Sequence, residues 1–113
     1  MSDDRLPTEL WVQVHLRRCS AQAMPAVLVR RGEAERGTVL LKLNQLEAGC
    51  RILTQARDLE GRLGWLPALG GQLVAEAEAD AYIARAIGRD PDLWVIEIED
   101  RSGHNPFDGK TIA

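Results

Sequence analysis

The strongest constraint on the fold lies near the end of the chain, in the stretch Asp92-Leu93-Trp94-Val95-Ile96-Glu97-Ile98-Glu99-Asp100. It begins as an unbroken apolar run and ends in an alternation of apolar and acidic residues, which is typical of a strand. Alternate residues of a strand share a face, so Trp94, Ile96 and Ile98 are expected in the core. The other face changes from apolar to acidic midway, and we therefore expect it to leave the interior there.

Glu97 and Glu99 share that second face and are about 6.6 Å apart along the strand, twice the rise per residue. The spacing suits a hydrolytic pair of carboxylates or a shared metal ion. It also suits cross-strand ion pairs, because other predicted strands offer basic or polar residues for one common face. These residues are Arg30, Lys42, Arg51 and Gln55. The ion-pair interpretation is favoured, since most charged side chains on strands are simply solvated.

The remaining elements follow from hydrophobic periodicity and from glycine and proline positions. A helix is expected from Pro7-Thr8-Glu9 to about Ala23, since the residue before Pro25 avoids helical angles. A second helix starts near Glu76 and is stopped by Gly88 and Pro91. Strands are expected at Ala26–Arg30, Thr38–Leu43, Cys50–Ala56 and Asp92–Asp100, with a short strand and loop in 61–71.

The short turns between the first three strands predict an antiparallel meander. The resulting order is α-β-β-β-(β)-α-β. This predicts one α+β domain over residues 1–113, with two helices on a mainly antiparallel sheet of four to five strands. Residues 1–6 and 102–113 are expected to be irregular.

The first helix carries two apolar stripes on different sides. Val12, Leu16, Cys19 and Ala23 form one stripe, and Leu10, Trp11, Val14 and Ala21 form the other. A chain of 113 residues has difficulty burying both stripes. We therefore predict a contact through Trp11, Leu10 and Val14, either in a homodimer or with another protein.

The charge distribution disfavours nucleic acid as a partner. The net charge is −3, and residues 1–62 carry +2 while residues 63–113 carry −5. Arg17, Arg18, Arg30 and Arg31 are weak candidates for phosphate contacts, because no aromatic residues interleave with them as single-strand stacking requires.

The cysteines and histidines do not predict a metal site or cofactor. Cys19 lies four residues after His15, but the only further soft or nitrogen ligands are Cys50 and His104. We expect two reduced thiols in a cytoplasmic protein, although a Cys19–Cys50 disulfide is an open alternative. No signal peptide or membrane-spanning run is recognisable.

Nearly the whole chain resembles a small bacterial family catalogued only as a domain of unknown function. The resemblance rests on the segments RLPTELWVQVHLRRC, PAVLVRRG, LLKLNQL, EADAYIARA and RDPDLWVIEIEDR, and on their order and spacing. It implies a cytosolic, single-domain bacterial protein, and it implies no activity and no catalytic residues.

The order of helices and strands is also similar to the core of the restriction-endonuclease-like nucleases. That superfamily places an acid on its second strand and Glu-x-Lys or Asp-x-Lys on its third. Here Val39–Leu43 has no acid, and the third strand offers Arg51, Thr54 and Gln55. A fold analogy of this kind says little about function.

We therefore expect a noncatalytic binding or protein-interaction module without a cofactor. Two alternatives stay open at this point. One is a hydrolytic or nuclease-like enzyme that uses Glu97 and Glu99, with Asp100 and His104 as further candidates. The other is a nucleic-acid-binding protein that uses the four arginines named above.

Overall fold

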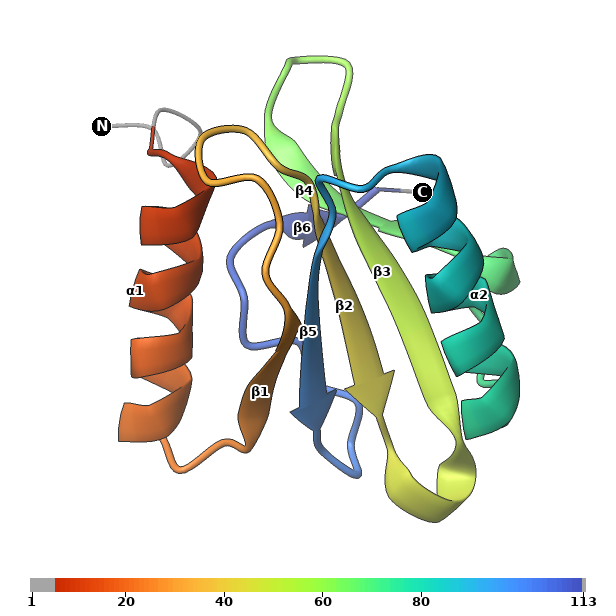
Figure 1. The fold of residues 1–113 in the computed structure, drawn as a ribbon. Coiled ribbons are helices and arrows are strands. Elements are labelled where there is room, and N and C mark those ends of the chain that lie inside the picture. Colours follow the sequence, from red (N-terminus) through yellow and green to blue (C-terminus); the bar gives the residue numbers. More distant parts are fainter. Residues whose placement is uncertain (1–5, 113) are drawn as a thin grey trace.

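The computed structural model describes residues 6–112, in which two helices flank a six-stranded sheet (Figure 1). The helices are α1 (Thr8–Ala21) and α2 (Glu76–Arg89). The strands are β1 (Ala26–Arg30), β2 (Val39–Asn44), β3 (Cys50–Arg57), β4 (Leu63–Pro67), β5 (Trp94–Glu99) and β6 (Lys110–Thr111). Short 3-10 helices η2 (Leu46–Ala48) and η3 (Leu69–Gly71) flank β3 and β4. The predicted α+β class is confirmed.

The sheet is mixed, with the strand order β1-β5-β2-β3-β4-β6. The predicted meander of β1, β2 and β3 is therefore wrong in its first half, because β5 lies between β1 and β2. β5 runs antiparallel to β1 and parallel to β2, whereas β2, β3 and β4 pair in sequence as antiparallel neighbours. The similarity to the nuclease core took β1, β2 and β3 as its first three strands, and β5 separates the first of these from the other two.

The connection between β1 and β2 explains the error. Residues 31–38 are long enough to cross over the start of β5, and they bind it on the way. Glu33 N–H donates to the Asp92 carbonyl at 3.0 Å, and Trp94 Nε1–H donates to the Glu33 carbonyl at 2.7 Å. A Cβ atom at Gly32 or Gly37 would lie 2.2 or 2.5 Å from the Asp92 oxygen, so glycine permits this close crossing.

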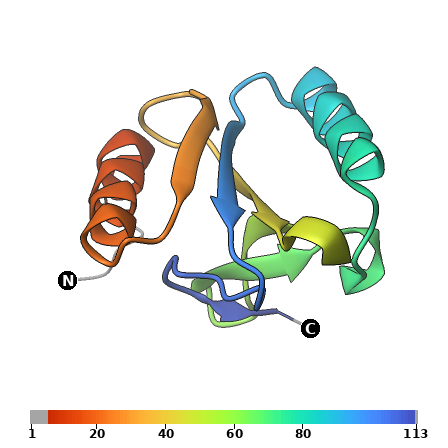
Figure 2. The same cartoon turned by 90° about the horizontal axis from the view of Figure 1, so that it is seen from below.

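The sheet separates two hydrophobic clusters. α1 packs on the face that carries Val39, Leu41, Trp94, Ile96 and Ile98, as predicted for the last three. α2 packs on the opposite face, against Leu40, Cys50, Ile52, Leu93 and Val95. Figure 2 shows the two helices on opposite sides of the curled sheet. A strand covered on both faces needs apolar residues at successive positions, and β2 with its sequence VLLKLN has them.

The prediction that residues 102–113 are irregular is wrong for part of this segment. β6 pairs parallel with β4 through Gly64–Lys110 and Trp65–Thr111, and Phe107 is buried in the cluster under α1. An aromatic residue in a glycine- and proline-rich tail gave only a weak local signal for this docking. The prediction for residues 1–6 falls almost wholly outside the described part of the chain.

α1 ends two residues earlier than predicted. Ala23 has a left-handed φ of 57°, and Met24 N–H donates to the Cys19 carbonyl at 2.9 Å, which closes the last turn. At the other end, Pro7 occupies the N-cap position, and Thr8 Oγ1–H donates to the Gly37 carbonyl at 2.9 Å instead of capping the helix. Neither described helix is long and apolar enough to cross a bilayer.

Candidate functional site

Glu97 lies in an ion-pair cluster around a buried lysine. Lys42 of β2 is opposite Glu97 of β5 in the parallel ladder, and their side chains approach to 3.6 Å. Lys42 Nζ also donates to Glu76 at 2.7 Å and to Asp80 at 2.8 Å, both on α2. Asn44 Nδ2–H donates to the second Glu97 oxygen at 3.0 Å. The predicted ion pair between a basic strand and the acidic strand is thus present at Glu97.

The other residues proposed for one polar face do not share it. Arg51 is opposite Leu43 and faces α1, whereas Lys42 is opposite Ile52 and faces α2. Gln55 also faces α1, where its oxygen accepts from Val39 N–H at 3.2 Å. Arg30 does not reach the glutamates, because its guanidinium donates to the carbonyls of Pro91 and Leu93.

The proton state of Lys42 excludes it as a general base. Burial lowers its pKa, but the hydrogen bonds that it donates to Asp80 and Glu76 and the charge of Glu97 outweigh burial, so the pKa lies above its ordinary range. The ammonium group is therefore charged at any physiological pH. Its three carboxylate neighbours leave a local excess of negative charge at the partly exposed end of α2.

The remaining candidates for the Glu97 and Glu99 enzyme line neither of the two hollows described below. Glu99 is exposed and makes no ion pair with another residue in 6–112. His104 is exposed, and its backbone N–H donates to Asp100 at 2.8 Å. This bond, together with a shorter one from Ser102 Oγ, lowers the pKa of Asp100. Asp100 therefore acts as the cap of a turn.

The thiols are free and buried in different clusters. Cys19 belongs to the cluster under α1 and Cys50 to the cluster under α2, so the sheet lies between them. Burial raises the pKa of both thiols, which keeps them protonated and unreactive. The two free cysteines agree with the prediction of two reduced thiols. Within residues 6–112, no three His, Cys, Asp or Glu side chains gather as a metal site would need.

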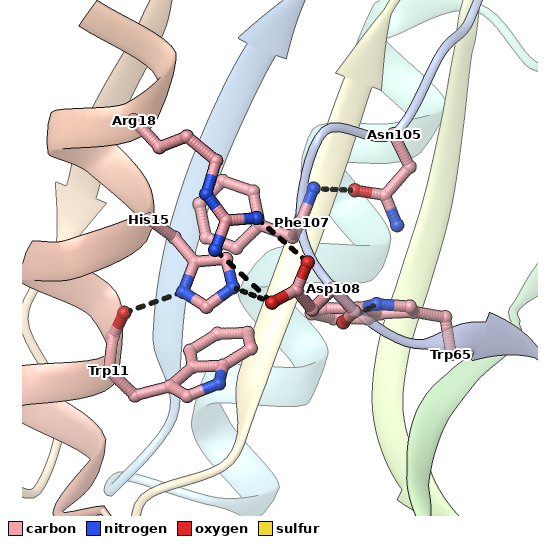
Figure 3. Close-up of polar contacts among 7 residues, drawn as sticks. All are labelled: Trp11, His15, Arg18, Trp65, Asn105, Phe107 and Asp108. Atoms are coloured by element: carbon pink, nitrogen blue, oxygen red, sulfur yellow. Dashed lines mark hydrogen bonds and ion pairs between the residues drawn. The ribbon is translucent and has the colours of Figure 1, made fainter. Parts of the chain in front are cut away.

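The best-connected polar group joins α1 to the C-terminal segment and centres on His15 (Figure 3). The His15 ring is buried between Trp11, whose ring centroid lies 3.9 Å away, and Phe107, which stacks at 5.1 Å. His15 Nδ1–H donates to the Trp11 carbonyl at 2.8 Å. Nε2 lies 3.3 Å from Asp108 Oδ2, an ion-pair contact that lacks the alignment of a full hydrogen bond.

Asp108 is the carboxylate at the centre of this group. Arg18 donates to both of its oxygens, at 2.7 and 3.2 Å, in the two-pronged geometry that guanidinium favours. The Arg18 hydrogen bond, helped by the charge of His15, holds the pKa of Asp108 below its ordinary value despite partial burial. Its carbonyl accepts from Trp65 Nε1–H at 2.9 Å. The segment is thereby attached to α1 and β4 together.

The four candidate arginines do not form one basic surface. Arg31 pairs with Glu9 in the first turn of α1 and lies over the Trp94 ring at 5.3 Å. Arg17 and Arg18 lie eight and nine residues later on the same helix, which is about 12–13 Å along its axis. Arg18 is engaged by Asp108 and Arg30 by backbone carbonyls. The two arginine pairs therefore lie apart along α1.

Trp11 is not available to a partner. Its side chain is only 4% exposed and packs with Trp65 and Phe107, so the prediction that it lies on an outer stripe is wrong. Trp11, Val12, His15 and Cys19 together form the buried face of α1. Leu10 and Val14 are exposed as predicted and border a hollow of about 460 Å³ with Gln13, Arg17, Arg18 and Ala21.

Two prominent features of the structure are not predicted by the sequence pattern. One is β1, which lies at the edge of the sheet and exposes Val27, Leu28 and Val29. The other is the His15–Asp108 contact, which joins residues 93 positions apart and leaves no local pattern. A larger hollow of about 560 Å³ lies beside the first turn of α1 and is lined by Thr8, Trp11, Thr38, Gln55 and Leu63, among others.

Comparison with known proteins places the whole fold in a known group. Residues 6–108 match the model of the family described as "Protein of unknown function (DUF1491)". A comparison with curated proteins found no match.

Two structures of a DUF1491 family protein from Caulobacter crescentus CB15 are similar to this chain. Its crystal structure is 33% identical, covers 96% of this chain and 99% of its own, and has a TM-score of 0.80. Its NMR structure covers 96% and 98% at 33% identity, with a TM-score of 0.81. A solution structure of a protein from A. tumefaciens shares the fold at 24% identity, with a TM-score of 0.70 over 85% of this chain and 86% of its own. The family match and this shared fold agree over nearly all described residues, and the chain therefore belongs to the DUF1491 family.

Proposed function

We propose that the protein is a noncatalytic protein-interaction module in which β1 pairs with β1 of a second copy of the chain. One observation carries the proposal. Five of the nine exposed large apolar side chains in residues 6–112 lie on α1 and β1, which are neighbours at one end of the molecule (Figures 1 and 2). They are Leu10, Val14, Val27, Leu28 and Val29.

The backbone of β1 supports strand pairing. Within residues 6–112, β1 has β5 on one side and no strand on the other. Glu99 N–H donates to the Pro25 carbonyl at 3.0 Å, so the alternation of an antiparallel ladder turns the N–H and C=O groups of Ala26 and Leu28 away from β5. An exposed apolar edge strand with free backbone groups is a template for another strand.

The sequence of β1 is compatible with pairing to itself. An antiparallel pair centred on Leu28 would place Val27 opposite Val29 of the second copy, on both sides of the two-fold axis. Val27 and Val29 are 62% and 56% exposed, and no charged residue lies between Ala26 and Val29. Four valines would then cover one another at the centre of a continuous sheet.

The contact is short, and this predicts a weak association. A register shift between Leu28 and Arg30 ends the regular ladder. A standard interface buries about 800 Å² on each partner, which four residues of strand do not provide alone. The exposed face of α1 around Leu10 and Val14 lies next to β1 and is proposed as the second part of the interface.

The candidate catalytic residues give less support to an enzyme than to an interaction module. Glu97 is already held by Lys42 and Asn44, and the thiols and Lys42 are in their unreactive protonated forms. The arginine pairs are separated, and Arg18 and Arg31 are each paired with a carboxylate, which likewise favours a protein over a nucleic acid as partner.

Sedimentation of the full chain from micromolar to millimolar concentration tests the proposal. The wild type should show an average mass that rises with concentration. The V27K variant should remain monomeric, because a lysine on an edge strand opposes pairing. The control is L59K, since Leu59 is fully exposed in the turn after β3 and should associate as the wild type does. A V14E variant, altered on α1, should associate more weakly than the wild type.

A wild type that stays monomeric at millimolar concentration would contradict self-pairing. So would a V27K variant that associates as readily as L59K. Unchanged circular dichroism of both variants would show that the comparison concerns association and not folding.

A further inference from the structure

The C-terminal strap, defined here as residues 104–112, covers an aromatic surface and a strand edge. Phe107 is 3% exposed and meets Trp11, His15 and Trp65. Beyond it, Ile112 N–H donates to the Trp65 carbonyl at 2.7 Å, and β6 pairs with β4. Displacing the strap would therefore expose two tryptophan rings and the free edge of β4.

An acceptor oxygen lies near each ring nitrogen of His15. Nδ1 faces the Trp11 carbonyl at 2.8 Å, and a carbonyl can only accept. Nε2 faces the Asp108 carboxylate at 3.3 Å, and an ionised carboxylate can also only accept. A neutral imidazole would turn a lone pair toward one of these oxygens. The observed arrangement thus fits the imidazolium form.

Four elements contribute polar or charged groups on this side of the sheet. α1 contributes Arg18, which pairs with Asp108, and Cys19, whose thiol is protonated. The strap contributes Asp108. β4 contributes the indole of Trp65, and β3 contributes Arg51, which faces α1. Asp108 is therefore the single anion that compensates a charge on His15 among the described residues.

We propose that the strap is a pH-sensitive device, closed on α1 while His15 carries its second proton and loosened when His15 loses it. Loss of the proton removes the attraction of Nε2 for Asp108 and leaves the exposed Arg18 pair to hold the strap. His15 forms the buried half of this contact, since its side chain is only 3% exposed, and Arg18 forms the exposed half.

The direction of the response follows from the signs of the charges. The closed state needs Asp108 ionised, and its lowered pKa keeps it ionised well into the acid range. The strap is therefore most firmly closed at mildly acid pH, and it loosens as pH rises through the titration of His15. Loosening of the strap exposes an aromatic surface and the edge of β4. This edge lies at the opposite end of the sheet from β1.

Amide hydrogen exchange and NMR of the H104Q variant test this proposal, because His15 is then the only histidine. Between about pH 5 and 8, the exchange protection of the Ile112 amide, corrected for the intrinsic pH dependence of exchange, should fall on the order of tenfold. The Trp65 indole signal should shift with the same midpoint as the His15 ring signals, since its N–H donates to the Asp108 carbonyl.

Two strap and helix variants separate the device from a purely structural role. D108N keeps the shape of the side chain but removes its charge, so protection of Ile112 should no longer change between the two pH values. R18Q should lower the protection of the Ile112 amide at both pH values. The change in protection between them should remain, because arginine stays charged over this pH range. Both sites are partly exposed, so the fold is expected to survive.

Three results would overturn the proposal. The first is a His15 ring that titrates while the protection of Ile112 stays constant. The second is a His15 ring that does not titrate in this range at all. The third is a D108N variant that keeps the wild-type step.

Discussion

At the scale of single residues, the buried lysine shows how one charge organises three others. Lys42 occupies a position in β2 where the pattern of the strand calls for an apolar residue, and it is nearly as buried as its neighbours. Three carboxylates from α2 and β5 compensate its charge. This makes Glu97 part of a structural ion cluster that joins two adjacent strands.

Replacing Lys42 with methionine should destabilise the fold by about 2 kcal/mol. Breaking a buried ion pair costs about 3–5 kcal/mol, and we reduce this because Glu76 and Asp80 are more than half exposed and can be solvated. Urea unfolding measures the change. The matched control is R85M, which alters an exposed basic residue on α2 and should change stability by less than about 0.5 kcal/mol.

A double variant K42M/E97Q tests the assignment of the partner. It should be less destabilised than the sum of the two single variants, because the uncompensated charge of Glu97 is also removed. Strict additivity would mean that Lys42 and Glu97 do not interact, and a stabilised K42M would mean that desolvation of the ammonium outweighs its three partners.

At the scale of elements, local patterns predicted the helices and strands well and their pairing less well. β5 was recognised with its core face, because alternation is a property of the strand alone. The neighbours of β1 depend on whether residues 31–38 turn back or cross over β5, and hydrophobic periodicity does not report this. Gly32 and Gly37 carried the missing information, since their spacing marks both points where the connection touches Asp92. The docking of Phe107 was missed for a similar reason, because its partners come from α1 and β4.

Alanine substitutions at Gly37 in the crossing segment and at Gly88 in α2 are expected to have opposite effects on stability. G37A should destabilise the protein by about 1–3 kcal/mol, because a new Cβ would lie 2.5 Å from the Asp92 carbonyl and 2.7 Å from that of Glu33. G88A should stabilise it by up to about 1 kcal/mol, since Gly88 is inside α2 and nothing lies within 4 Å of its Cβ position. Thermal unfolding of both variants measures the difference. A G37A variant as stable as the wild type would show that residues 31–38 can move away from β5.

At the scale of the whole molecule, the sheet divides the interior into two clusters with one buried thiol in each. Cys19 reports on the cluster that α1, β4 and the strap enclose, and Cys50 on the cluster under α2. Burial raises the pKa of both thiols, so neither reacts without an opening that admits solvent. The two thiols are therefore internal probes of whether the two halves of the fold open together.

We expect Cys50 to be labelled only through global unfolding and Cys19 to be labelled faster. β2, β3 and β5 separate the clusters and pair over their full lengths, whereas the cluster around Cys19 is closed in part by the strap with its two-residue strand. Small structural units of this kind open at lower free energy than central strands do. Labelling of the C19S and C50S variants with a thiol reagent in native buffer isolates each rate. Equal rates in the two variants would show that the strap opens only when the whole domain unfolds, and a faster Cys50 would place the weaker half of the molecule under α2.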